Sequence, residues 1–178
     1  MRKAIHTRDI QSQVWLLDDE LWEIEIRLLD TKGYDTRVGL DRELPAGDAL
    51  HEMRIRLEVG FDQVIRKIDV AMPYTPFEIC PGVMRNFDSL VGESMARGWN
   101  ALLSERFSGA GGCRHLVDML RSAATVLFQA MSYQHEFTPE QIPYWTDSCH
   151  AFRKDGEVIR ELKRRFPGQN GEEQAEAV

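Results

Sequence analysis

Leu21-Trp22-Glu23-Ile24-Glu25-Ile26-Arg27-Leu28-Leu29 is the stretch that decides the fold. Apolar and charged residues alternate along most of it, which is typical of a β-strand with one face in the core and the other in water. Residues 50–59 repeat the pattern, with four apolar side chains expected on one face: Met53, Ile55, Leu57 and Val59. A sheet with one solvated face is antiparallel. The two stretches therefore predict a half-buried antiparallel sheet.

Shorter candidate strands and a group of helices surround these two stretches. Further strands are expected at residues 5–10, 13–17 and 64–72, and long loops at the glycine- and proline-containing residues 31–48 and 72–82. Apolar residues then recur every three or four positions, which predicts helices over residues 83–91, 93–106 and 113–133. The expected fold class is α+β, with an N-terminal antiparallel β-meander packed against a C-terminal group of helices.

The last part of the chain is less regular. Thr138 and Pro139 are typical of a helix start, and Pro143 is expected to cut that helix short. Lys154-Asp155-Gly156 indicates the turn of a small hairpin, and residues 157–166 either continue it or form a helix. Residues 167–178 are polar and acidic, so we expect a disordered tail. One domain is therefore predicted over residues 1–166.

Composition narrows the class of protein. The chain has 178 residues, 43% of them hydrophobic, and a formal net charge of −7. This acidic balance argues against nucleic acid or an anionic membrane surface as a main partner, since both favour a basic patch. We see neither a secretory signal after Met1 nor an apolar run near the roughly 20 residues that span a bilayer. We expect a cytoplasmic protein whose three cysteines stay reduced.

The strongest local signal is Gly109-Ala-Gly-Gly-Cys-Arg-His-Leu116, where a glycine-rich loop runs into the longest predicted helix. A cysteine in the first turn of a helix lies near free N–H groups and the positive end of the helix dipole, which favour its thiolate. His115 adds a second metal ligand or a base. On a regular helix, however, side chains two positions apart diverge. The stretch is therefore expected to form one wall of a site whose other walls come from elsewhere.

Other thiols and imidazoles are dispersed along the chain. No close-spaced metal motif such as Cys-x-x-Cys or His-Glu-x-x-His is present. The pooled metal-ligand candidates are Cys80, Cys113, Cys149, His51, His115 and His150. Each also has a structural explanation, because a reduced cysteine can be a small core residue and a histidine at a strand end can lie on the surface.

Three functions from different classes follow from this inventory. The first is binding of zinc or an iron–sulfur cluster at a Cys/His site. The second is a small-molecule enzyme in which Cys113 acts with His115 or His51 as a nucleophile or an acid/base group. The third is a non-catalytic accessory or binding module. The expected partner is a metal or a small molecule, while the reaction, if any, and the oligomeric state do not follow from the sequence.

Three stretches resemble an uncharacterised bacterial family, domain of unknown function 2889: Pro45 to Leu57, Gly111 to Leu116, and Asp147 to Ala151. The resemblance covers nearly all of the chain except the tail. It implies a coherent fold and the positions of a site, but it names no activity.

A more distant similarity is to iron–sulfur scaffold proteins of the NifU type, which share the order of loop, strands, cysteine loop, helices and a cysteine before the last long helix. In that comparison Cys80 and Cys113 match scaffold cysteines, and His115 matches a displaced histidine. Pro45-Ala46-Gly47-Asp48 lacks the cysteine of the corresponding scaffold loop, and the helper-protein docking motif is absent. The similarity implies a NifU-like fold with a metal site at one end.

Overall fold

The structure, a computed structural model, describes residues 2–17, 21–96, 98–131, 139 and 142–166 of the chain. Its contacts divide the chain into two compact units, Met1–Ala130 and Met131–Val178, and each is described by itself. The single domain expected over residues 1–166 stays a prediction. The tail expected at residues 167–178 lies outside the described residues.

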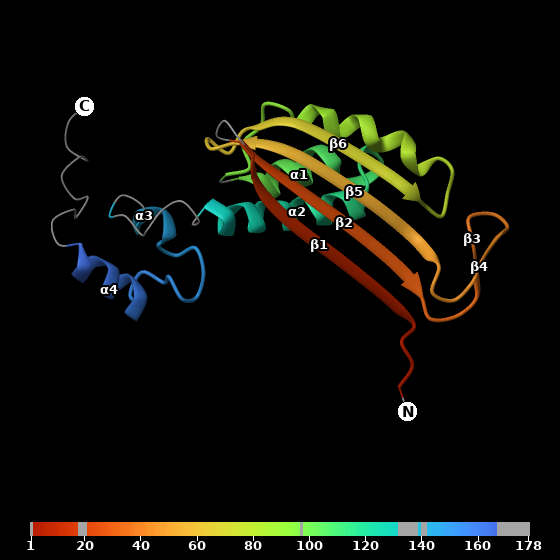
Figure 1. The fold of residues 1–178 in the computed structure, drawn as a ribbon, viewed down its shortest axis with the longest axis horizontal. Helices are drawn as coiled ribbons and strands as arrows, with labels where there is room; N and C mark the ends of the chain where they lie inside the picture. The colour runs from red at the N-terminus through yellow and green to blue at the C-terminus, as the bar shows by residue number, and fades with distance from the viewer. Residues whose placement is uncertain (1, 18–20, 97, 132–138, 140–141, 167–178) are drawn as a thin grey trace. The chain divides into compact units, whose positions relative to one another are not determined.

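A four-stranded antiparallel sheet forms the centre of the first unit (Figure 1). Its strands, in the order in which they pair, are β1 (His6–Leu17), β2 (Leu21–Lys32), β5 (Ala49–Gly60) and β6 (Ile65–Tyr74). The two short strands expected in the first 17 residues are one strand, which pairs with β2 from His6 opposite Lys32 to Leu17 opposite Leu21. Each strand pairs antiparallel with its neighbour, so the predicted antiparallel sheet is confirmed.

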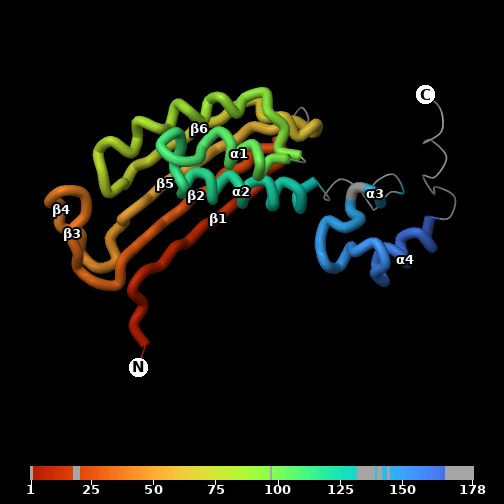
Figure 2. Tube along the Cα trace, turned by 180° about the vertical axis from the view of Figure 1, so that it is seen from behind, coloured from red at the N-terminus to blue at the C-terminus, as the bar shows by residue number. Residues whose placement is uncertain are grey.

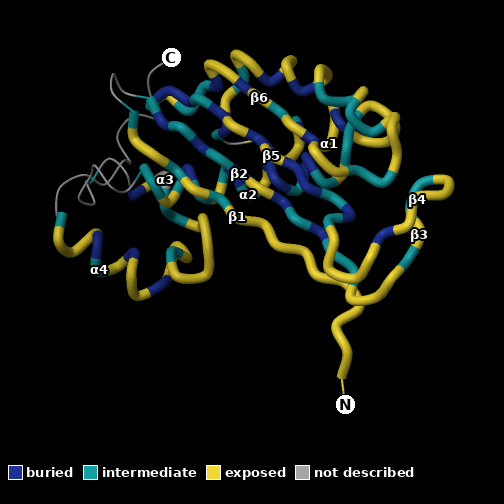
Figure 3. Tube along the Cα trace, turned by 45° about the vertical axis from the view of Figure 1, so that its right-hand side comes forward, coloured by how far each residue is buried: buried dark blue, intermediate teal, exposed yellow. Residues whose placement is uncertain are grey.

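Buried residues alternate with more exposed ones along most of the central strands β2 and β5 (Figure 3). All eight apolar residues expected inside are buried: Trp22, Ile24, Ile26, Leu28, Met53, Ile55, Leu57 and Val59. The opposite face carries cross-strand ion pairs, such as Arg27 with Glu52 at 3.2 Å and Lys67 with Glu58 at 3.3 Å. Such partly exposed pairs add little stability individually. Apolar burial therefore provides the main stabilisation of the sheet.

Helices cover the apolar face of the sheet (Figures 1 and 2). The long helix α2 (Arg114–Ala130) packs against β1, β2 and β5, and α1 (Trp99–Phe107) packs beside it. The indole Nε1 of Trp99 donates a hydrogen bond to the carbonyl of Leu120 at 3.0 Å. The buried stripe of α2 is Leu116, Val117, Met119, Leu120, Ala123 and Leu127. The 3₁₀ helix η1 (Cys80–Leu90) lies along β6 and adds Phe87 to the core, stacked on Phe107 at 4.3 Å.

Several predicted boundaries differ from the structure. The helix expected over residues 93–106 begins only at Trp99, after Gly98, whose φ of 94° is left-handed and not helical. The loop expected over residues 31–48 contains a small hairpin, β3 (Thr36–Val38) and β4 (Arg42–Leu44), turned at Gly39 with φ 64°. Val91, expected inside, is half exposed.

The second unit has a small core of its own. α3 (Ile142–Trp145) and α4 (Glu157–Arg165) bury Ile142, Ile159 and Leu162, with Phe152 and Phe166 packed against them. Pro143 lies within α3, and Thr138, the expected helix cap, lies outside the described residues. Of the two alternatives for residues 157–166, the structure has the helix.

Candidate functional site

A carboxylate ends the apolar inner row of β2. Asp30 lies two residues beyond Leu28 on the same face of the strand, and none of its surface is exposed. In the register of the sheet, Asp30 lies opposite Arg8 of β1 and His51 of β5. The pairing with β5 shifts directly after Asp30, at a β-bulge. Strand register therefore brings a carboxylate, a guanidinium and an imidazole into one row at this end of the sheet.

Arg8 holds Asp30 by two hydrogen bonds. Its Nε donates to Oδ1 at 2.7 Å and its NH2 group donates to Oδ2 at 2.8 Å, a bidentate geometry. Burial by itself raises the pKa of Asp30, but the hydrogen bonds and charge of Arg8 outweigh it, so the net pKa is lowered. The same hydrogen bonds raise the pKa of Arg8. Asp30 is therefore ionised at neutral pH.

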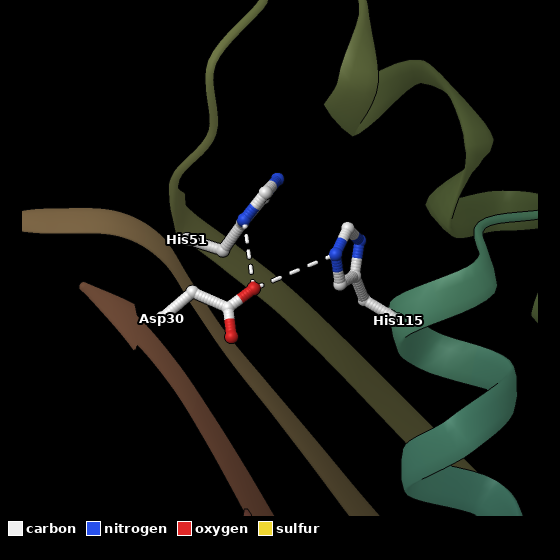
Figure 4. A group of neighbouring side chains, drawn as sticks. All are labelled: Asp30, His51 and His115. Atoms are coloured by element: carbon white, nitrogen blue, oxygen red, sulfur yellow. Dashed lines mark hydrogen bonds and ion pairs between the residues drawn. The ribbon is translucent and has the colours of Figure 1, made fainter. Parts of the chain in front are cut away.

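Two histidines face the same carboxylate oxygen, His51 from β5 and His115 from α2 (Figure 4). His51 Nδ1 lies 3.0 Å from Asp30 Oδ2, and His115 Nε2, from the first turn of α2, lies 3.5 Å from it. The two imidazole rings are 4.0 Å apart, centre to centre. Because Asp30 is ionised, a neutral His51 ring donates its Nδ1 proton to the carboxylate.

Both imidazoles are neutral at pH 7. Burial, followed by the proximity of His115, lowers the pKa of His51 to about 4. Burial, followed by the positive charge of Arg8, also lowers the pKa of His115. The attraction of Asp30 opposes both shifts without reversing them. A neutral imidazole has the nitrogen lone pair that ligation of a metal or acceptance of a proton requires.

Cys113 lies beside this group. Its Sγ is 3.7 Å from His115 Nδ1, so the two side chains meet although they are only two residues apart. Cys113 lies just before the helix, and its carbonyl accepts the first helical bond, from Val117 N–H. The preceding loop packs tightly, since a Cβ on Gly112 would lie 2.2 Å from the carbonyl oxygen of Phe107. The glycine-rich loop therefore serves close backbone packing at the start of α2.

The structure brings together only some of the ligand candidates. In the described part of the chain, the potential ligand atoms of Asp30, His51 and His115 all lie within 4.8 Å of one another, and no other group of three or more His, Cys, Asp and Glu side chains does so. Cys113 borders this group through His115. Cys80 begins η1 outside the group, and the exposed Cys149 and His150 belong to the second unit.

Sequence reasoning missed Asp30, Arg8 and His6, whose Nε2 lies 3.5 Å from Asp30 Oδ1. A signal was present for Asp30, because extending the alternation of β2 by one step beyond Leu28 places a carboxylate on the buried face. The same alternation places His51 on the buried face of β5, two residues before Met53. For Arg8 and His6 the only signal is the strand register, which becomes visible when the pairing is known.

The first unit also matches a known family. The family model for DUF2889, a protein of unknown function, matches residues 6–129. The chain belongs to this family. The matched segment runs from the start of β1 to near the end of α2, so the DUF2889 region contains every residue of the cluster around Asp30.

The other comparisons add no relative. No curated protein and no solved structure matches the chain. The similarity to NifU-type scaffolds therefore stays a prediction. None of the helices in the described residues is both long and apolar enough to cross a membrane.

Proposed function

We propose that the DUF2889 unit binds one divalent transition-metal ion through Asp30, His51 and His115. The observation that carries this proposal is the convergence of one buried carboxylate and two imidazoles from three separate elements within 4.8 Å. Two imidazoles and a carboxylate are a donor set that zinc and non-haem iron take in proteins, with coordination positions left open for water or substrate.

The distances support the proposal. Two ligand atoms that are each about 2.1 Å from a tetrahedral ion lie about 3.4 Å from one another. The distances from Asp30 Oδ2 to His51 Nδ1 and to His115 Nε2, 3.0 and 3.5 Å, are close to that value. Binding therefore requires a small separation of side chains and, for ligation through Nδ1 of His51, a change to its other tautomer.

The surroundings of the three residues have the character of an outer coordination shell. Arg8 fixes the orientation of the Asp30 carboxylate through both of its oxygens. Cys113 contacts the ring nitrogen of His115 that faces away from Asp30. Partners of this kind orient ligands and tune a metal site. A bound ion would supply Lewis acidity, and because the pKa of each histidine is lowered, one nitrogen of each ring is unprotonated at neutral pH.

The donor atoms favour a mononuclear ion over the iron–sulfur cluster that the sequence also suggested. A cluster requires several thiolates. In the described residues, Cys113 is the cysteine that borders the group, while Cys80 and Cys149 lie outside it. Zinc or a single iron ion is therefore the preferred metal of this proposal.

Metal content and affinity test this function. We expect the full chain, purified with and without oxygen, to retain zinc or iron and the stripped protein to bind about one equivalent of Zn²⁺ or Co²⁺. His51→Ala and His115→Ala should weaken binding at least about 100-fold, more than the loss of an outer-shell partner typically does. His150→Ala is the matched control and should bind as the wild type does.

The result that contradicts the proposal is a content below about 0.1 equivalent in both preparations together with no binding on titration. The spectrum of the Co²⁺ form separates the donor sets, because thiolate ligands add an intense near-ultraviolet charge-transfer band that imidazole and carboxylate do not. A strong band in the wild type that is lost in Cys113→Ala would show that the Cys113 thiolate ligates the ion in place of one of the proposed ligands.

A second candidate function is favoured by a different observation. Cys113 Sγ, the His115 ring and the Asp30 carboxylate lie in series, with contacts of 3.7 and 3.5 Å. A thiol beside an imidazole that a carboxylate orients is the arrangement of a cysteine nucleophile. In this alternative the DUF2889 unit is an enzyme acting on a small electrophilic substrate, and no metal occupies His115.

Alkylation rates distinguish the two functions. If Cys113 is a nucleophile, iodoacetamide should modify it at pH 7 at least about 10-fold faster than the exposed Cys149, and His115→Ala should abolish the difference. Slower alkylation of Cys113 than of Cys149 would contradict the enzyme alternative and leave the metal proposal unaffected.

A further inference from the structure

β1 is a long edge strand with few of the features that protect edges. The strand order places it at one side of the sheet, where it pairs with β2, and within the described residues no other strand lies along its second edge. Its twelve residues contain no proline or lysine, and its charged side chains, Arg8 and Asp9, lie near one end. An edge of this kind presents unpaired backbone N–H and C=O groups to another strand.

The inner side of β1 is also less covered than that of its neighbour. Ile24, Ile26 and Leu28 of β2 have no exposed surface, whereas Ile10 and Leu16 of β1, on the same face of the sheet, are 38% and 43% exposed. Helix α2 therefore covers the inner face of β1 only in part, whereas these three residues of β2 are fully covered. A strand added beside β1 would cover these side chains.

The sequence of β1 is nearly symmetric about Ser12 over five residues, from Ile10 to Val14. Around Ser12, the residues on either side are alike: Gln11 and Gln13 are identical, and Ile10 and Val14 are both β-branched and apolar. Residues that lie opposite each other in a sheet have their side chains on the same face. In two copies of one strand, these are two even-numbered or two odd-numbered residues. A two-fold axis normal to the sheet therefore pairs residues whose numbers add to an even sum. An axis at Ser12 satisfies this rule.

We propose that β1 is the interface of a homodimer, in which two copies of β1 pair antiparallel about a two-fold axis at Ser12. The two sheets would then form one continuous sheet. This inference concerns an interaction surface and does not depend on metal binding or on the reactivity of Cys113.

The register at Ser12 pairs similar residues near the axis and brings no like charges together farther out. Ile10 lies opposite Val14 of the second copy, which buries apolar surface on the inner face. Gln11 lies opposite Gln13, so their amides can hydrogen-bond across the interface on the outer face. Arg8 lies opposite Leu16 and Asp9 opposite Trp15, so no two like charges face each other. The pairing uses residues 7–17 and stays within the strand.

Charges introduced at the two glutamines test the interface. Gln11 and Gln13 are exposed in the single chain, so substitution there should leave its fold intact. The wild type should have the mass of a dimer in light scattering at about 100 µM and dissociate on dilution. Gln11→Lys/Gln13→Lys and Gln11→Glu/Gln13→Glu should each be monomeric because like charges oppose. An equimolar mixture of the two should form a heterodimer, since opposite charges then pair.

A matched control and a second measurement complete the test. Asn100→Lys/Ala101→Lys adds the same charge to exposed positions of α1 and should remain dimeric. In the wild type, amide hydrogen exchange in residues 7–17 should slow as the concentration rises from about 1 to about 100 µM. A monomeric wild type, a dimer unaffected by both charged pairs, a mixture that stays monomeric, or exchange independent of concentration would each overturn the proposal.

Discussion

Asp30 stands at an inward position of β2 where the preceding inward positions carry tryptophan, isoleucine and leucine. A buried carboxylate is costly unless its charge and lone pairs are satisfied, and here Arg8, His51 and His115 do this from β1, β5 and α2. One side chain thus connects its own strand, β2, with β1, β5 and α2. An isolated carboxylate in a hydrophobic row would be a defect in the core, but this one is the centre of a polar cluster.

Removing the charge of Asp30 should destabilise the protein. Asp30→Asn keeps the shape of the side chain but leaves the Arg8 guanidinium without the carboxylate that binds it through both oxygens. We expect a loss of about 2–4 kcal/mol of unfolding free energy in urea denaturation. Asp118→Asn is the control, because the Asp118 carboxylate is 3.6 Å from Arg8 and partly exposed, and it should cost less than about 1 kcal/mol. Equal effects of the two substitutions would contradict the central role of Asp30.

The pH dependence of stability should report on His51. Its pKa is about 4 in the folded protein, below the 6.5 of an ordinary histidine, so between these values the unfolded chain binds more protons than the folded one. Unfolding free energy, measured with a chelator present, should therefore fall by about 2–3 kcal/mol from pH 6.5 to pH 4 and stay level just above pH 6.5. The lowered pKa of His115 acts in the same direction.

His51→Asn is the informative variant for this dependence. The asparagine amide can donate to Asp30 in place of Nδ1 but does not titrate, so the profile between pH 4 and 6.5 should become shallower. A variant profile as steep as that of the wild type would show that His51 titrates normally.

At the scale of elements, β2, β5 and α2 were predictable because each repeats its pattern over nine or more residues. Twofold alternation identified the buried face of both strands, and three- and four-residue spacing identified that of the helix. The β3–β4 hairpin was not predictable, since strands of three residues are too short to show a period. The late start of α1 depends on the conformation of Gly98, which apolar spacing does not report.

The candidate site was predictable only in part, because it depends on strand pairing as well as on local patterns. Local sequence drew attention to Cys113 and His115 through the loop before α2, and to His51 as one of the imidazoles. The partner that brings the two histidines together, Asp30, depends on which residues of β2 and β5 lie opposite each other. Register is a property of pairs of strands and is not contained in either strand alone.

Neighbouring residues of β2 offer a direct test of its two faces. Ile26 has no exposed surface and Glu25 lies on the opposite face, beside Arg56 at 3.9 Å. Ile26→Ala should cost about 2–5 kcal/mol of unfolding free energy because it leaves a cavity beneath α2. Glu25→Ala should change it by less than about 0.5 kcal/mol. Comparable costs at the two positions would contradict the assignment of faces.

At the scale of the molecule, the family and the compact unit coincide. The DUF2889 match covers residues 6–129, and the first unit covers residues 1–130. The four-stranded sheet, the helices that cover it and the cluster around Asp30 all lie within this region. The second unit has its own small apolar core, built from α3, α4 and the chain between them.

The first unit should therefore fold without the second. A fragment of residues 1–130 is expected to show a single cooperative thermal transition in circular dichroism, since most of the apolar face of its sheet is covered by α1, α2 and η1. It should bind Zn²⁺ with the affinity of the full chain. The corresponding fragment with Asp30→Asn is the control and should bind more weakly. A fragment without a cooperative transition would show that the second unit is required for folding.

The hydrogen bond from Trp99 to the Leu120 carbonyl makes this tryptophan an intrinsic fluorescence probe of the position of α2. Trp99 is almost fully buried, and its indole is bound to the middle of the helix whose first turn carries His115. If α2 detached from the sheet, this indole would meet water and its emission would shift to longer wavelength. In a chain where phenylalanine replaces the other three tryptophans, fluorescence would follow in real time the detachment and return of the helix that carries His115.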